Sequence, residues 1–155
     1  MSLKRKLEGE IEIREGASDA FYDIYKSKPH LVSHASSHFV QSCDLHHGDF
    51  GTPGAILSWN YTLDGKAGVC KTEIEKVDDE NRLVRQKVIG GDLMDDYKSL
   101  VFTCHVVPKD KETSIVRWIF EYEKVRPGVP EPSAMMDSVL AAAKDIDDRH
   151  HGIKK

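Results

Sequence analysis

The feature that most constrains the fold is an imbalance between one long helical pattern and many strand patterns. Residues 132–149 form the only long segment in which apolar side chains recur at helical spacing. The apolar side is expected to carry Met136, Val139, Leu140, Ala143 and Ile146, and the opposite side Asp137, Lys144, Asp145, Asp148 and Arg149. Pro132 suits the first turn and Gly152 the end. One helix must therefore cover a whole sheet, largely with alanine and methionine, which predicts an internal cavity.

The rest of the chain consists largely of segments in which apolar and polar residues alternate. The first, residues 3–14, places Leu7, Ile11 and Ile13 on one side. Ser18 is predicted to cap a short helix that ends before Pro29, and residues 31–36 to form a second one. Six further strands are predicted over residues 39–45, 56–63, 69–77, 83–89, 100–106 and 116–122. This order predicts an α+β fold, in which a bent antiparallel sheet wraps around the long helix.

Composition narrows the class of protein. A chain of 155 residues suits a single domain, expected over residues 1–155. The net charge of −4 argues against a nucleic-acid-binding surface. No apolar run approaches the ~18 residues of a membrane span, and Glu8 and Glu10 interrupt the apolar core that a signal peptide needs. Three widely spaced cysteines (Cys43, Cys70 and Cys104) predict reduced thiols and a cytoplasmic protein.

The predicted inner faces of the strands concentrate large aromatic side chains. Rings with occasional polar tips can enclose an apolar ligand and orient it. This wall is expected to comprise Phe39, Leu57, Trp59, Tyr61, Leu100, Phe102, Cys104, Trp118, Phe120 and Tyr122, with Thr72 and Gln86 as polar anchors. Tyr25, His30, Leu31, Met136, Val139 and Leu140 are expected to close the entrance, with Met135 and Met136 as adaptable gate residues. The same alternation also fits a filled core, in which these aromatic side chains pack only against one another.

Three glycines within residues 48–54 predict a tight loop with positive φ angles between two strands. A phosphate-binding loop is the alternative. That reading lacks the Lys-Ser/Thr pair of such loops, and a strand pattern follows instead of a helix. A hairpin loop is therefore predicted.

The spacing of the residues gives little support for a catalytic site or a metal site. His34 and His38 are four apart, but no continuous helix is expected to join them, and no Cys/His spacing matches a structural zinc site. The acidic clusters at residues 78–80 and 95–96 suit solvated turns. The inward positions of the clearest strands carry no lysine, aspartate or glutamate, so Tyr61 and Tyr122 are the candidates for proton transfer. No metal or cofactor is predicted, and an enzyme is the less favoured reading.

Several collinear motifs carry a family resemblance. They are KSKPH at residues 26–30, GDFGTPG at 48–54, SWNY at 58–61, DGK at 64–66, GD at 91–92, YK at 97–98, VVPK at 106–109 and EYEK at 121–124. Together they resemble the Bet v 1 superfamily of plant proteins, and within it the major latex protein branch, related to the class-ten pathogenesis-related proteins. Gly90 departs from the pattern, because relatives commonly carry glutamate before the Gly-Asp pair.

The resemblance implies a helix-grip, START-like fold, in which a seven-stranded curved sheet and two short helices enclose a hydrophobic cavity with the C-terminal helix. Family members bind steroids, hormones, flavonoids, fatty acids or alkaloids, with links to defence and stress responses. We therefore expect a binder or carrier of a small hydrophobic or amphipathic ligand, acting as a monomer, with a weak dimer left open. Two alternatives remain. One is an enzyme of alkaloid metabolism, although the interior lysine, carboxylate and tyrosine of such relatives are not assembled here. The other is a structural or defence protein with a filled core.

Overall fold

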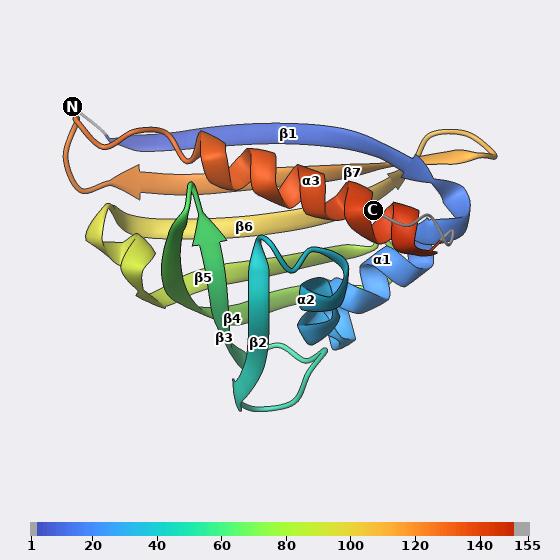
Figure 1. The fold of residues 1–155 in the computed structure, drawn as a ribbon, viewed down its shortest axis with the longest axis horizontal. Helices are drawn as coiled ribbons and strands as arrows, with labels where there is room; N and C mark the ends of the chain where they lie inside the picture. The colour runs from blue at the N-terminus through green and yellow to red at the C-terminus, as the bar shows by residue number, and fades with distance from the viewer. Residues whose placement is uncertain (1–2, 151–155) are drawn as a thin grey trace.

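The computed structural model describes residues 3–150, so the predicted helix end at Gly152 lies outside the described part of the chain. The elements are β1 (Lys4–Arg14), α1 (Glu15–Ser27), the 3-10 helix η1 (Pro29–Leu31), α2 (Val32–Ala35), β2 (Val40–His47), β3 (Ile56–Leu63), β4 (Lys66–Asp78), β5 (Leu83–Gly91), the 3-10 helix η2 (Asp92–Asp95), β6 (Tyr97–Pro108), β7 (Thr113–Lys124) and α3 (Ser133–His150). Figure 1 shows α3 running along the sheet, with α1 and α2 gathered near its C-terminal end.

The strands form one seven-stranded sheet in the order β1-β7-β6-β5-β4-β3-β2. All neighbouring strands are antiparallel, and β1 forms one edge of the sheet, where it pairs with β7 along its length, from Lys4 opposite Glu123 to Arg14 opposite Thr113. The curved sheet and the long helix confirm the predicted α+β helix-grip fold. The loop at residues 48–54 joins β2 to β3 as predicted, with positive φ at Gly48, Gly51 and Gly54.

Alternation along the strands decides which side chains reach the core. In β7, Val116, Trp118, Phe120 and Tyr122 are all buried, while the residues between them are more exposed. The same two-residue period buries Cys70, Thr72 and Ile74 in β4. Successive strand side chains point to opposite faces, so these rows line the side of the sheet that faces α3.

The helix α3 approaches β1 closely at Gly9. A Cβ atom placed on Gly9 would lie 2.7 Å from Met136 Sδ and 3.0 Å from Leu140 Cδ1. Met136 and Leu140 therefore pack on the β1 backbone, where only glycine leaves room for them. Ala142 and Ala143 are completely buried on the same helix. The short side chains of Ala142 and Ala143 thus serve close packing, and the expectation that alanines of this helix leave ligand space is wrong at these two positions.

The predicted solvent-facing side of α3 is wrong at Asp148. Both Asp147 and Asp148 are buried, at 1% and 6% exposure. Asp147 Oδ1 accepts a hydrogen bond from the Arg14 backbone N–H at 3.2 Å, and Asp148 Oδ1 lies 3.5 Å from Arg14 Nη2. Lys144 Nζ lies 3.3 Å from Asp147 Oδ2. Buried carboxylates are tolerated where charges and donors meet them, and here Lys144 comes from α3 itself while Arg14 comes from β1, 133 residues before Asp147.

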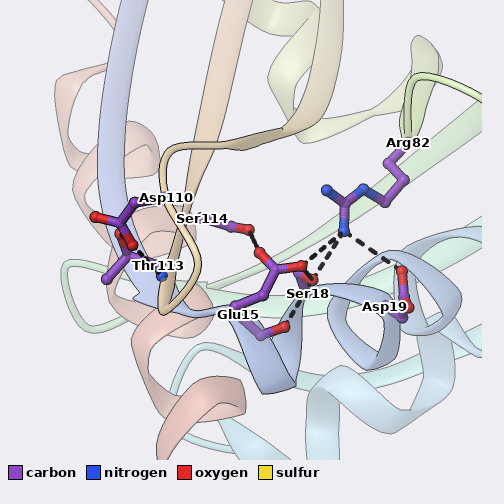
Figure 2. Close-up of polar contacts among 7 residues, drawn as sticks. All are labelled: Glu15, Ser18, Asp19, Arg82, Asp110, Thr113 and Ser114. Carbon is purple, nitrogen blue, oxygen red and sulfur yellow. Dashed lines mark hydrogen bonds and ion pairs between the residues drawn. The ribbon is translucent and has the colours of Figure 1, made fainter.

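The prediction that Ser18 caps α1 is also wrong, because the helix follows β1 without a break and begins at Glu15. Ser18 is buried inside the first turns, and its Oγ donates to the Glu15 carbonyl oxygen at 2.8 Å. Figure 2 shows the surrounding network: Arg82 donates to Ser18 Oγ at 2.8 Å and to Asp19 at 3.4 Å, and Ser114 Oγ donates to the Glu15 carboxylate. This network joins the start of α1 to the β4–β5 turn and to β7.

One strand departs from the predicted alternation. The register of β2 shifts between Val40 and Ser42. A β-bulge adds one residue and reverses the parity beyond it, which explains why Val40 and Cys43 are both buried. Leu45 follows Cys43 on the same parity but is 38% exposed, in the second half of an edge strand. The 3-10 helix η2 at Asp92–Asp95 was not predicted, since four residues carry no readable period.

Candidate functional site

The candidate site is an internal cavity of about 70 Å³ between the sheet, the short helices and the N-terminal half of α3. Apolar side chains dominate its wall, and a few neutral polar groups interrupt them. The cavity is lined by Tyr25, Val32, Phe39, Val40, Trp59, Tyr61, Cys70, Thr72, Gln86, Leu93, Phe102, Trp118, Met135 and Val139. These residues come from α1, α2, η2, α3 and most strands of the sheet, so the whole fold positions them.

More than half of the residues expected from the sequence meet at this cavity. They are Tyr25, Phe39, Trp59, Tyr61, Thr72, Gln86, Phe102, Trp118 and Val139. Adjacent strands bring some of them together, because Gln86 of β5 pairs with Phe102 of β6. The helix α1 adds Tyr25, whose ring meets that of Trp118 edge-on at 5.2 Å between ring centroids. The strands with unbroken alternation supply most of this set.

The other expected residues lie elsewhere in the fold. Leu57, Leu100, Cys104 and Phe120 are packed into the solid core beside the cavity. The Tyr122 hydroxyl leaves the interior to donate to Glu131 at 2.5 Å. Met136 and Leu140 pack on Gly9, as described above. Leu31 lies in an outer groove with Ile24 and Ile146, and His30 is exposed beside Phe50, so neither reaches the cavity.

Sequence reasoning missed several lining residues, and each has a physical reason. Of the two methionines expected as gate residues, only Met135 reaches the cavity, because the helix is rotated so that Met135 and Val139, one turn apart, face the sheet centre. Val40 lines the cavity because of the bulge in β2. Leu93 belongs to η2, an element without a sequence signal. Cys70 lies on the same face of β4 as Thr72 and Ile74, as its spacing predicts, but it was not predicted to line the cavity.

Three polar side chains of the wall form a chain of hydrogen bonds across three strands, in which each side chain donates to the next. Trp59 Nε1 of β3 donates to Thr72 Oγ1 of β4 at 3.1 Å. Thr72 Oγ1 donates in turn to Gln86 Oε1 of β5 at 2.7 Å. Thr72 is 2% exposed and Gln86 6%, so these two members of the chain are almost fully removed from bulk water, while Trp59 is half-buried. Buried hydrogen-bond networks hold their side chains in single rotamers. This network therefore places a polar group at a defined position in an otherwise apolar wall.

The ionisable groups of the wall are held in their neutral forms. Burial, reinforced by Cys70 and Asp92, raises the pKa of Tyr61 to about 12. Burial and the charge of Asp92 raise the pKa of the Cys70 thiol to about 12. Burial also raises the pKa of Tyr25 far above its usual range. Since no aspartate, glutamate, lysine or arginine is among the described residues that line the cavity, its wall is uncharged near neutral pH.

The arrangement of side chains and the length of the helices in residues 3–150 bear on metal binding and on membrane spanning. Within residues 3–150, no group of three His, Cys, Asp or Glu side chains is arranged to hold a metal ion. None of the helices in that range is long and apolar enough to cross a membrane. The three cysteines are buried free thiols.

Comparison with known proteins assigns the family. The model of the pathogenesis-related protein Bet v 1 family matches residues 2–150. The chain belongs to the Bet v 1 family. Its relatives include MLP-like protein 34 of Arabidopsis thaliana, 46% identical over 143 residues, which are 92% of this chain and 45% of that protein. MLP-like protein 43 of the same plant is 43% identical over 95% of this chain and 93% of its own length. The predicted resemblance to major latex proteins is confirmed.

The chain spans less than half of the length of MLP-like proteins 34 and 28, at 45% and 44%, and most of MLP-like protein 43. Among solved structures, ginseng major latex-like protein 151 from Panax ginseng superposes with a TM-score of 0.90 at 36% identity, covering 96% of this chain and 98% of that one. Norcoclaurine synthase from Thalictrum flavum, solved with dopamine and hydroxybenzaldehyde, has a TM-score of 0.77 at 21% identity, over 99% and 90% of the chains. This second similarity is one of fold alone.

Proposed function

We propose that this protein binds a small hydrophobic or amphipathic molecule in the cavity between α3 and the sheet, as a carrier or receptor of steroid-, hormone-, flavonoid-, fatty-acid- or alkaloid-like ligands. The observation that carries the proposal is the wall itself: large rings, an uncharged surface and one buried hydrogen-bonded chain. Ligand sites in proteins combine an apolar lining with few polar groups in this way. The family resemblance supports a role in defence, and the three free thiols support a cytoplasmic location for the expected monomer.

The size of the cavity adds a condition to this proposal. An apolar cavity of about 150 Å³ accommodates benzene, and sites for drug-sized ligands measure about 300–1,000 Å³. The cavity of about 70 Å³ must therefore enlarge before a fused-ring ligand enters. Met135 suits this task, because an unbranched thioether side chain repacks with little strain. Leu93 and Val32, which also line the cavity, lie on elements of only four residues each.

Catalysis in the same cavity is the less supported use. Proton transfer is most efficient when the acting group has a pKa near the working pH. Burial moves the pKa values of Tyr25, Tyr61 and Cys70 upward, away from that range. A neutral wall favours holding a ligand over transforming it.

Replacing Val139 by phenylalanine tests the proposal directly. The added ring projects from α3 into the cavity, so we expect the affinity for Nile red, an uncharged environment-sensitive dye, to fall by at least about tenfold. Filling a cavity with apolar atoms should leave the melting temperature unchanged or higher. Fluorescence titration of the purified protein measures the affinity.

Ala141→Phe is the matched control, because Ala141 is exposed on the outer side of the same helix. It should bind the dye as the wild-type chain does. Equal dye affinity in Val139→Phe and Ala141→Phe would refute binding in this cavity.

A further inference from the structure

The orientation of Gln86 within the buried chain follows from its neighbours. An indole N–H only donates, so the Thr72 hydroxyl must accept from Trp59, and its single hydrogen remains for Gln86. The Thr72–Gln86 distance of 2.7 Å is typical of O–H···O bonds and shorter than most N–H···O bonds. Gln86 therefore presents its carbonyl oxygen to Thr72 and keeps its amide NH₂ group for another partner.

That NH₂ group has no hydrogen-bond partner among residues 3–150, and its nitrogen is not fully buried, although Gln86 lines the cavity and is only 6% exposed as a residue. Trp118, which also lines the cavity, has a buried indole nitrogen without a partner in the same range. A buried donor without an acceptor is costly. The oxygens of Thr72 and Gln86 already take part in hydrogen bonds, and the Tyr25 and Tyr61 hydroxyls of the wall can donate as well as accept. A ligand acceptor would therefore gain more from this wall than a ligand donor.

The charge of the wall restricts the ligand further. An anion or a cation moved into the cavity would lose its hydration and meet no opposite charge from the described lining residues. An uncharged ligand oxygen loses less hydration free energy than an ion does, and it gains a hydrogen bond from the unpaired amide of Gln86.

We infer that the cavity selects uncharged ligands that carry a hydrogen-bond acceptor, such as a ketone, ester or ether oxygen, and holds that oxygen against the amide nitrogen of Gln86. The Trp59–Thr72–Gln86 chain is the positioning device, because it fixes which end of the amide faces the ligand. This inference rests on the proposed function of the same cavity.

The test uses three small molecules with one skeleton: acetophenone, α-methylstyrene and benzoate. They carry C=O, C=CH₂ and a carboxylate at the same place, so size and shape are matched. Their dissociation constants are measured by displacement of Nile red from the wild-type chain and from Gln86→Met. Gln41→Met is the control, because Gln41 is exposed on β2 and its side chain bonds to Ser37 and Thr62 outside the cavity.

We expect the ratio of the acetophenone to the α-methylstyrene dissociation constant to rise about tenfold in Gln86→Met, and to stay constant in Gln41→Met. Comparing ratios removes the different solubilities of the two compounds in water. Benzoate should not displace the dye at pH 7. In the wild-type chain, NMR spectra should show the Gln86 side-chain NH₂ protons moving downfield with acetophenone but not with α-methylstyrene, a readout that requires only the native fold.

A ratio that changes less than about twofold in Gln86→Met, unmoved NH₂ resonances, or benzoate binding equal to that of acetophenone would each overturn the inference while the cavity remains a ligand site. If none of the dye or the three compounds binds, the proposed function fails and the inference falls with it.

Discussion

Replacing Gly91 by alanine should destabilise the protein by about 3 kcal/mol or more, the largest effect expected from adding one methyl group to this chain. Gly91 ends β5 with φ of +99°, a backbone conformation that disfavours side chains. A Cβ atom there would lie 2.2 Å from the carbonyl oxygen of Val69 and 2.9 Å from Cys70 Cα. Both obstacles are backbone atoms, so relief requires β4 to move where Cys70 lines the cavity. Urea denaturation measures the change through its midpoint.

Gly90→Ala provides the matched control, one residue away. Its φ is not in the positive range, and an added Cβ would approach no closer than 3.8 Å to Lys71 Cβ. We expect a change within about 1 kcal/mol for Gly90→Ala. Similar losses of stability in both variants would show that the close approach of β4 to Gly91 is not what requires glycine.

Replacing Asp147 by alanine should cost about 3 kcal/mol of stability, because it breaks a buried set of charges. The Asp147 side chain is completely buried, accepts from the Arg14 backbone N–H at 3.2 Å and lies 3.3 Å from Lys144 Nζ. Its removal leaves that N–H without its acceptor beside Arg14 Nη1, which is already buried without a partner in the described chain. The end of β1 and the last turns of α3 then lose a polar connection. Urea denaturation again supplies the free energy of unfolding.

Two further variants separate charge from hydrogen bonding at this position. Asp147→Asn keeps an acceptor oxygen but removes the charge, so its loss of stability should fall between those of the wild-type and Asp147→Ala. Asp137→Ala, on the exposed side of the same helix, should change stability by about 0.5 kcal/mol or less. A loss of stability at Asp147 no larger than that at Asp137 would contradict a stabilising role for the buried network.

The sequence predicted those parts of the site that regular alternation determines. Trp59, Tyr61, Thr72 and Trp118 lie in stretches of strand that keep the two-residue period, and all four line the cavity. The number and order of elements follow from the same pattern, together with the turn residues between strands. The local pattern suffices here because the alternation along each strand determines which of its side chains point inward.

What the sequence could not supply depends on contacts between distant elements. Residues 141–143 are all alanine, so the pattern of α3 leaves its rotation open, and Gly9 of β1 decides that Met136 packs there while Met135 faces the cavity. The sequence alone gives no sign that Asp147 and Asp148 are buried, because their partner Arg14 lies on β1, far away in the chain. The bulge in β2 changes parity without a glycine or proline to mark it. Each of these is a tertiary effect that overrides a local period.

The most direct test of ligand binding inside the sheet uses the two tryptophans of the chain. Trp59 and Trp118 are the only tryptophans in the sequence, and both line the cavity. Titrating ¹⁵N-labelled protein with uncharged acetophenone should shift both indole N–H resonances along one saturable curve. Shifts confined to the outer groove around Leu31 and Ile146, with both indole signals unmoved, would contradict binding in the cavity.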